Sequence, residues 1–142
     1  MNVLVGYESR GGRTRRAAEA IADALRTEGH DAKVRPLSEI GPEEVEGVDA
    51  LFVGAWVEGF ILFGVGPARG ARLWLDRLPS LGGTPAGVFC TYAFHPRGTL
   101  GELRRGLEGR GAKVVAERAF HRRRPAEGAG ALVREFLARA TS

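Results

Sequence analysis

The sequence predicts a three-layer α/β fold, in which a doubly wound, five-stranded parallel sheet of strand order 2-1-3-4-5 lies between two layers of helices. Three observations support this fold class. Short apolar stretches alternate along the chain with longer stretches of helical periodicity. Two of the apolar stretches, 50–55 and 85–91, lack polar alternation, which is typical of strands covered on both faces. The length of 142 residues, with 44% hydrophobic residues, suits one domain spanning 1–142.

The first half of the chain is expected to form two strands and one long helix. The first strand is expected at 2–7, the helix at 14–28 and a short second strand at 31–36. Gly29 ends the helix, and the linking segment 37–46 has room for a helical turn. Apolar residues at helical spacing place one helix face on the sheet: Ala17, Ala18, Ile21, Ala22 and Leu25.

The second half continues the alternation of strand and helix. A third strand at 50–55 leads into the least regular segment, 56–69, and then into a helix at 68–78. Thr99 is expected to cap the next helix, with Glu102 three residues later in a capping-box pattern. The remaining elements are a strand at 85–91, a helix at 99–110, a strand at 113–120 and a helix at 127–140.

A loop rich in glycine and hydroxyl groups joins the first strand to the first helix. Backbone N–H groups at a helix start are unpaired and together carry partial positive charge, so a phosphate placed there satisfies them. Gly11 and Gly12 allow close backbone approach, and Ser9 and Thr14 offer hydroxyl groups. Neither a P-loop nor a GxGxxG fingerprint is present at this loop. The pattern indicates an anion-binding corner, and a plain strand–helix turn is the alternative.

This corner resembles the signature of flavodoxins, which combines an aromatic residue, a hydroxyl residue, a small residue, a threonine, an alanine and an aliphatic residue. The matching residues are Tyr7, Ser9, Gly12, Thr14, Ala18 and Ile21. The chain departs from the signature at Gly6, Gly11 and Arg13, where the family prefers an apolar side chain, a second hydroxyl residue and often asparagine. The resemblance in element order extends over essentially the whole chain. It implies a flavodoxin-like fold that binds flavin mononucleotide (FMN).

The resemblance also implies which residues hold FMN. In a sheet of this order, ligands bind beyond the carboxyl ends of the strands, where the loops after the first, third and fourth strands meet. The first loop would take the phosphate, and Trp56 and Tyr92 would flank the isoalloxazine ring by aromatic stacking. The alternatives are a core anchor at Trp56 and a solvated edge tyrosine at Tyr92. The residues expected at the cofactor are Ser9, Arg10, Gly11, Gly12, Arg13, Thr14, Ala55, Trp56, Val57, Glu58, Gly59, Thr91, Tyr92, Ala93 and Phe94.

Further residues near these loops have two interpretations each. Glu58 either accepts a hydrogen bond from a ring N–H or faces solvent, and His95 either donates to the reduced ring or lies in solvent. The apolar run 60–63 is expected in a loop, either as a lid or docking patch or as part of the core. Gly54 suits close backbone approach to the flavin. Cys90, the only cysteine, is expected to be a small apolar filler, and we expect no metal site and no catalytic residue.

The charge balance bears on partners. The formal net charge is +4, and nearly all of the positive charge comes from arginine. A net positive charge favours an acidic redox partner protein. Nucleic-acid binding is not expected, because the positive charges are scattered outside 121–124 and no aromatic residues are interleaved with them. The apolar stretch 50–66 is too short and too often broken by glycine for a membrane span. A cytoplasmic protein is expected, since no signal-peptide pattern precedes the first strand and a single cysteine permits no internal disulfide.

These observations favour an FMN-binding, flavodoxin-like electron carrier. Two alternatives stay open at this point. One is an enzyme, an FMN-dependent NAD(P)H:quinone-type oxidoreductase that reduces a small quinone-like acceptor. The other is a flavin-free module of the same fold that binds an anion or a partner protein.

Overall fold

The computed structural model describes residues 1–9, 11–60, 63–67, 69–93 and 98–140, and for 58–60, 63–67 and 69 it describes the backbone alone. The strands are β1 (Asn2–Glu8), β2 (Asp31–Pro36), β3 (Ala50–Phe60), β4 (Phe63–Pro67), β5 (Pro85–Tyr92) and β6 (Lys113–His121). The helices are α1 (Arg13–Thr27), α2 (Pro42–Glu46), α3 (Arg69–Asp76), α4 (Thr99–Glu108) and α5 (Ala129–Ala140), with a 3-10 turn, η1, at Leu37–Glu39. Expected and observed helix limits differ by no more than two residues.

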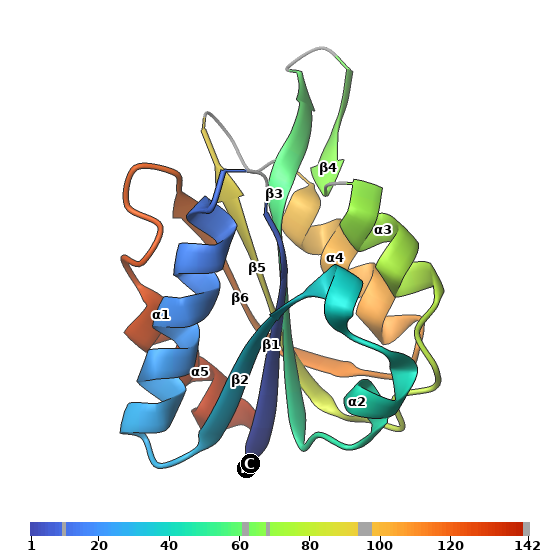
Figure 1. The fold of residues 1–142 in the computed structure, drawn as a ribbon, viewed down its shortest axis with the longest axis vertical. Coiled ribbons are helices and arrows are strands. Elements are labelled where there is room, and N and C mark those ends of the chain that lie inside the picture. Colours follow the sequence, from blue (N-terminus) through green and yellow to red (C-terminus); the bar gives the residue numbers. More distant parts are fainter. Residues whose placement is uncertain (10, 61–62, 68, 94–97, 141–142) are drawn as a thin grey trace.

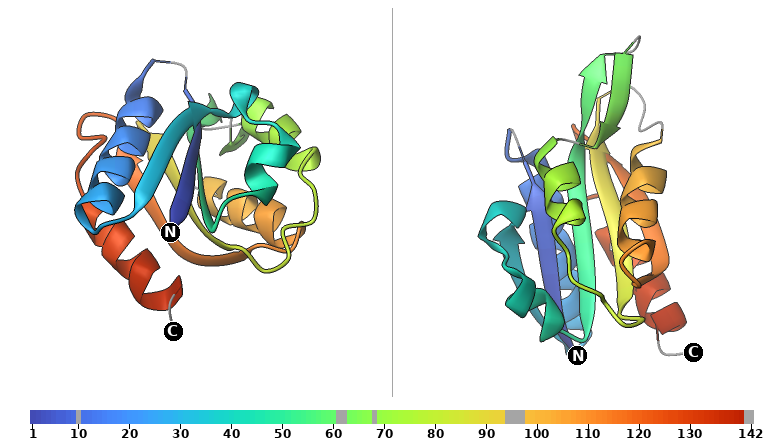
Figure 2. Two further views of the ribbon diagram at one scale, coloured as in Figure 1. Left: turned by 60° about the horizontal axis from the view of Figure 1, so that its bottom comes forward. Right: turned by 90° about the vertical axis from the view of Figure 1, so that its right-hand side faces the viewer.

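One twisted sheet runs through the molecule (Figures 1 and 2). Five of its strands are parallel and lie in the order β2-β1-β3-β5-β6, which confirms the predicted order 2-1-3-4-5 once β4 is set aside. β3 lies at the centre, paired with β1 on one side and β5 on the other. The carboxyl ends of these three strands therefore meet at one edge of the sheet.

Helices cover both faces of the sheet and bury two separate cores. On one face, α1 and α5 pack on the sheet, and the rings of Phe52 and Phe136 lie 4.6 Å apart between their centroids. On the other face, α2, α3 and α4 cover residues such as Leu51 and Val88. Because both faces of β3 and β5 are buried, these strands read as continuous apolar runs. Among the described helices, none is long and apolar enough to cross a membrane.

The segment 56–69 is more regular than the sequence indicated. β3 continues to Phe60, and β4 returns from Phe63 as its antiparallel partner, with an irregularity in register between Glu58 and Phe60. This hairpin extends beyond the end of the parallel sheet (Figure 1). The expectation of a loop at Phe60 and Phe63 is wrong, while residues 61–62 lie outside the described part. Glycines at 59, 64 and 66 interrupt the apolar alternation that would have revealed the strands.

The predicted capping box at α4 is also wrong. Gly98 occupies the N-cap position without any side-chain cap bond, and Thr99 is the first helical residue. Thr99 is fully buried, and its Oγ1 has no hydrogen-bond partner within the described part of the chain. Glu102 instead forms an ion pair with Arg72, with 3.7 Å between Nε and Oε2. Burial of the threonine side chain under the helix start prevents it from reaching back as a cap.

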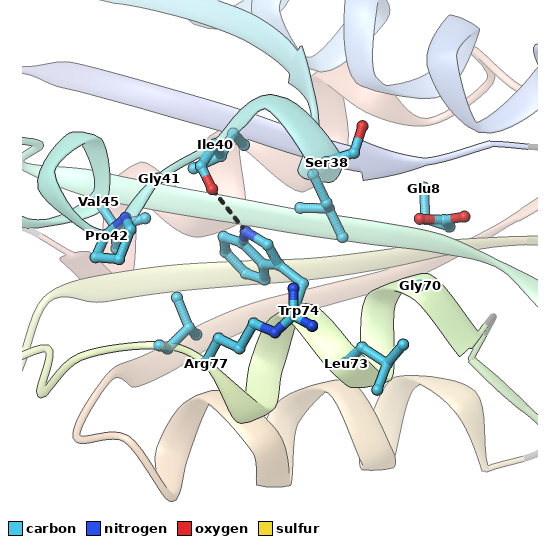
Figure 3. Close-up of a pocket in the computed structure, with 12 residues that line it drawn as sticks. Glu8, Ser38, Ile40, Gly41, Pro42, Val45, Gly70, Leu73, Trp74 and Arg77 are labelled. Atoms are coloured by element: carbon cyan, nitrogen blue, oxygen red, sulfur yellow. Dashed lines mark hydrogen bonds between the residues drawn. The ribbon is translucent and has the colours of Figure 1, made fainter.

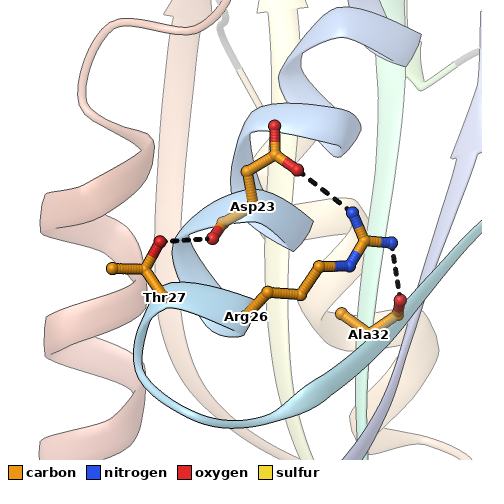
Figure 4. Close-up of polar contacts among 4 residues, drawn as sticks. All are labelled: Asp23, Arg26, Thr27 and Ala32. Carbon is orange, nitrogen blue, oxygen red and sulfur yellow. Dashed lines mark hydrogen bonds and ion pairs between the residues drawn. The ribbon is translucent and has the colours of Figure 1, made fainter.

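The edge strand β2 is tied to the end of α1 by an arginine (Figure 4). The guanidinium of Arg26 donates to the carbonyl oxygen of Ala32 at 2.7 Å and to Asp23 at 3.0 Å. The hydroxyl of Thr27 donates to the carbonyl oxygen of Asp23 at 2.9 Å. A cation in the last turn of a helix also interacts favourably with the helix dipole. Arg26, in the last turn of α1, therefore links the helix to the edge strand through the carbonyl oxygen of Ala32.

The absence of a side chain at Gly54 serves core packing. Gly54 of β3 is the register partner of Phe89 in β5, and a Cβ at position 54 would overlap the phenylalanine ring. From the sequence we expect Gly54 to allow close backbone approach to the flavin. In the structure, its missing side chain instead leaves room for the ring of Phe89.

We expect Gly54→Ala to lower the free energy of unfolding by about 1–3 kcal/mol, because the core must shift to admit one methyl group. Urea denaturation followed by circular dichroism measures this change. Gly47→Ala is the matched control: its position has an ordinary negative φ of −87° and a Cβ there meets only ordinary contacts. The control is expected to change stability by less than about 0.5 kcal/mol. Equal losses in the two variants would contradict the packing role.

Candidate functional site

A cavity of about 360 Å³ opens at the carboxyl ends of the central strands. It brings together the three segments that the sequence singled out, from the β1–α1 corner, the end of β3 and the end of β5. The residues that line it are Gly11, Arg13, Thr14, Trp56, Val57, Thr91, Tyr92, Ala93 and Arg122. Parallel pairing explains the meeting, because Trp56 of β3 is the register partner of Thr91 in β5. Its size falls in the range of small-molecule sites.

The β1–α1 corner presents backbone donors to this region. Gly12 is the N-cap of α1 and has a φ of 82°, a left-handed conformation that favours glycine. Its N–H donates to Ser9 Oγ at 3.0 Å, and its carbonyl oxygen accepts from the Arg16 N–H at 3.1 Å. The next N–H groups of the first turn have no acceptor within the helix. The first turn contains no acidic residue, so nothing in it competes with an incoming anion.

The hydroxyl of Thr14 lies beneath the corner. Thr14 and Thr91 are both buried, and their Oγ1 atoms are 2.7 Å apart in a hydrogen bond that joins α1 to β5. This bond uses one of the two hydroxyl protons and leaves the other for a further acceptor. Thr14 therefore fixes the start of α1 on the sheet as well as lining the cavity.

The two aromatic residues lie at strand ends. Trp56 belongs to β3 and Tyr92 is the last residue of β5, and both are half-buried beside the cavity. The ring of Tyr92 lies edge-on to that of His121, with 5.3 Å between centroids and an interplanar angle of 82°. Trp56 is therefore not a fully buried core anchor, and Tyr92 is not a fully solvated edge tyrosine.

The remaining predicted residues have other surroundings. Ser9 and Gly12 line a neighbouring cavity of about 320 Å³ that also includes Glu8 and Arg15, and neither of them is among the lining residues of the first cavity. Ala55 is fully buried within β3, away from the cavity wall. Glu58 and Gly59 belong to the β3–β4 hairpin, where only the backbone is described. The remaining predicted residues, Arg10, Phe94 and His95, lie outside the described part of the chain.

Sequence reasoning missed Arg122 as a residue of this cavity. Arg122 directly follows β6, the neighbour of β5 in the sheet, so the same edge of the sheet positions it. Its N–H donates to the carbonyl oxygen of Tyr92 at 2.8 Å. The available signal was a basic run placed immediately after a strand. Arg13 and Arg122 are the charged residues among the described residues that line the cavity, and no carboxylate is among them.

Cys90 is an inert core residue, which confirms its expected role as an apolar filler. It is fully buried in β5. Burial, with a smaller contribution from the charge of Glu117, raises the pKa of its thiol to about 12. The thiol therefore stays protonated at neutral pH and does not act as a nucleophile.

A second cavity, of about 390 Å³, lies between the η1–α2 segment and α3 (Figure 3). The indole Nε1 of Trp74 donates to the carbonyl oxygen of Ile40 at 3.2 Å and holds the two sides together. Glu8 and Arg77 lie toward different ends of the view, with Trp74 between them. Most of the lining is apolar, and its charged residues are one carboxylate, Glu8, and one arginine, Arg77, in place of the two arginines of the first cavity. It is therefore less suited to an anionic ligand.

Comparison with known proteins places the fold. No protein-family model and no curated protein sequence matches the chain. A flavodoxin from the domain Archaea has a similar structure, with a TM-score of 0.83 and 18% identity over 100% of both chains. The two-electron reduced flavodoxin of Megasphaera elsdenii gives a TM-score of 0.82 and 21% identity over 99% of both chains. Rubredoxin oxygen:oxidoreductase of Desulfovibrio gigas gives 0.75 and 17% identity, over 99% of this chain and 37% of that one. The fold is therefore flavodoxin-like, as the resemblance implied.

The buried Thr14–Thr91 pair generates a prediction about stability. Thr14→Val and Thr91→Val should each lower the free energy of unfolding by about 1–3 kcal/mol, because each leaves the other hydroxyl buried without this partner. The double variant should lose clearly less than the sum of the two single losses, because it removes both hydroxyls together. Urea denaturation of the four proteins measures the coupling. Additive losses would show that the two hydroxyls do not interact.

Proposed function

We propose that the protein binds FMN in the cavity at the carboxyl ends of β1, β3 and β5 and acts as an electron carrier. The observation that carries the proposal is the meeting, in one cavity, of a donor-rich helix start with two half-buried aromatic side chains. The similarity of the fold to flavodoxins supports it. FMN combines the two features that this cavity is suited to bind, an anionic phosphate and a flat ring system.

The β1–α1 corner fits the phosphate. An added Cβ at Gly12 would meet no atom of the described residues within 4 Å, so the described part of the chain leaves open space at the helix start. The unpaired N–H groups of the first turn would donate to phosphate oxygens. Arg13 lies in the same turn, and its exposed guanidinium adds full positive charge to the partial charge of the helix dipole.

The strand ends fit the ring system. Trp56 and Tyr92 come from different strands, yet they line the same cavity and would contact the ring by stacking. When bound, FMN supplies reversible one-electron and two-electron chemistry. The residues of this chain would orient the ring and exclude water from its buried parts. Because both aromatic residues are only half-buried, an edge of the site stays within reach of a partner.

The charge around the cavity supports an acidic redox partner. We define the basic rim as Arg13, Arg16, Arg122 and Arg123, which are all exposed. The β6–α5 loop lies beside the start of α1 in Figure 1 and in the left-hand view of Figure 2. No ion pair joins a rim residue to a described acidic residue, unlike Arg15, which pairs with Glu19. A surface of one sign steers partners of the opposite sign toward the site.

Flavin binding is tested by titrating the apoprotein with FMN and following the visible spectrum and flavin fluorescence. The wild-type protein should perturb both signals. Gly12→Asp should weaken binding by about tenfold or more, because it places a carboxylate at the proposed phosphate position. Gly12→Asn is the matched control, since asparagine has the same shape and equally tolerates the left-handed conformation.

The outcomes of this titration separate the candidate functions. Wild-type protein that leaves the flavin spectrum and fluorescence unchanged at saturating FMN contradicts the proposal. If the Gly12→Asp and Gly12→Asn variants bind FMN equally well, the phosphate does not bind at this corner. Holoprotein that oxidises NADH with a quinone in the absence of any other protein points to the enzyme alternative instead of the carrier.

The basic rim generates a prediction about electron-transfer rates. In the reduced holoprotein, the double variant Arg16→Glu/Arg123→Glu should slow oxidation by ferricyanide several-fold at low salt, and the difference should shrink as salt screens the charges. Ferricyanide serves as an anionic probe of the field that an acidic partner meets. Neither substituted residue lines the cavity. Stopped-flow absorbance measures the rate constants.

The control changes the same kind of charge elsewhere. Arg77 is exposed directly after α3, on the other face of the sheet, so Arg77→Glu should leave the rate nearly unchanged. A rim variant that reacts as fast as this control would show that the rim does not guide anionic partners.

A further inference from the structure

We infer that Arg122 binds the phosphate group of the ligand, so that arginines from two separate elements hold the anion in this cavity. The inference rests on the proposed function, because it concerns the same site. It adds a binding residue that the β1–α1 signature does not contain. Arg122 lies far along the chain from that signature, immediately after the last strand.

The cavity wall provides the first argument. Arg13 and Arg122 line it together with Gly11 and Thr14, which belong to the donor-rich corner. Two guanidinium groups at one small cavity repel each other, and no carboxylate among the described lining residues offsets them. An anion bound between them removes this repulsion.

The backbone around Arg122 provides the second argument. The Arg122 N–H donates to the carbonyl oxygen of Tyr92 at 2.8 Å, so the end of β5 holds this residue beside the cavity. The next residue, Arg123, donates its N–H to His121 Nδ1 at 3.2 Å and does not line the cavity. The loop therefore presents one arginine to the cavity and leaves its neighbour outside. This arrangement also provides a control variant with the same chemistry.

The charge of a phosphate monoester provides the third argument. Near pH 7 such a group carries a charge of about −1.5 to −2. The helix N-terminus contributes about half a positive charge and Arg13 a full one, together about +1.5, which leaves up to about half of one negative charge of the dianion uncompensated. The guanidinium of Arg122 supplies more than this remainder. Arginine also suits phosphate geometrically, since its planar fork of donors can bind two oxygens at once.

The test compares FMN with riboflavin, which has the same ring system without the phosphate. Arg122→Gln should weaken FMN binding by about tenfold and leave riboflavin binding within about twofold, because the lost contact is to phosphate alone. Arg123→Gln should change neither affinity by more than about twofold, since exposed charges outside the cavity are screened. Arg122→Lys should recover part of the FMN affinity, because it restores the charge without the fork. Fluorescence titrations of the folded apoproteins measure all of these affinities.

Each outcome decides the inference separately from the proposed function. If wild-type protein binds FMN and the Arg122→Gln and Arg123→Gln variants behave alike, the inference is overturned and the FMN function stands. If Arg122→Gln weakens riboflavin as much as FMN, Arg122 contacts the ring and the inference is again overturned. If wild-type protein binds neither flavin, the proposed function fails. In that case, thermal stabilisation of the protein by inorganic phosphate tests the role of Arg122. If only Arg122→Gln loses this stabilisation, the inference that two arginines bind the anion is supported. If phosphate stabilises all variants equally, the inference is overturned.

Discussion

The parallel pairing of the central strands is the constraint on which the rest of the structure depends. It brings the end of β1 beside β3, where Glu8 faces Ala55, and the end of β3 beside β5, where Trp56 faces Thr91. The helix start that follows β1 and the aromatic residues that end β3 and β5 therefore share one cavity. A slip of one residue in either pairing would turn each side chain to the opposite face of the sheet and dismantle this arrangement.

The electrostatics of the corner have an unusual consequence for stability. Arginines in the first turn of α1 have the same sign as the positive end of the helix dipole, so they disfavour the helix start. Glu19 offsets Arg15, whereas Arg13 and Arg122 at the cavity have no ion pair with a described acidic residue. A bound anion would relieve this repulsion. Such binding would also stabilise the fold, because the corner exists only in the folded state.

The floor of the cavity is continuous with the hydrophobic core. The hydrogen bond between Thr14 and Thr91 fastens the helix start to β5, and the ring of Phe89 fills the space that Gly54 leaves in β3. Close packing of this kind resists displacement of the backbone, because neighbouring side chains are already in contact. The site is therefore built on strand ends and a helix start whose positions the core holds in place. The β3–β4 hairpin, by contrast, extends beyond the sheet.

The sequence by itself determined the succession of the five parallel strands, their order in the sheet and the sheet edge where a candidate site is expected, because hydrophobic periodicity and parallel topology are local and general rules. It could not reveal the β3–β4 hairpin, since glycines hide the alternation there, nor the burial of Thr99, which follows from packing. Only the tertiary structure joined Thr14 to Thr91 and placed Arg122 beside the first corner. Those contacts connect residues far apart in the chain, and a local pattern carries no information about which distant side chains pack together.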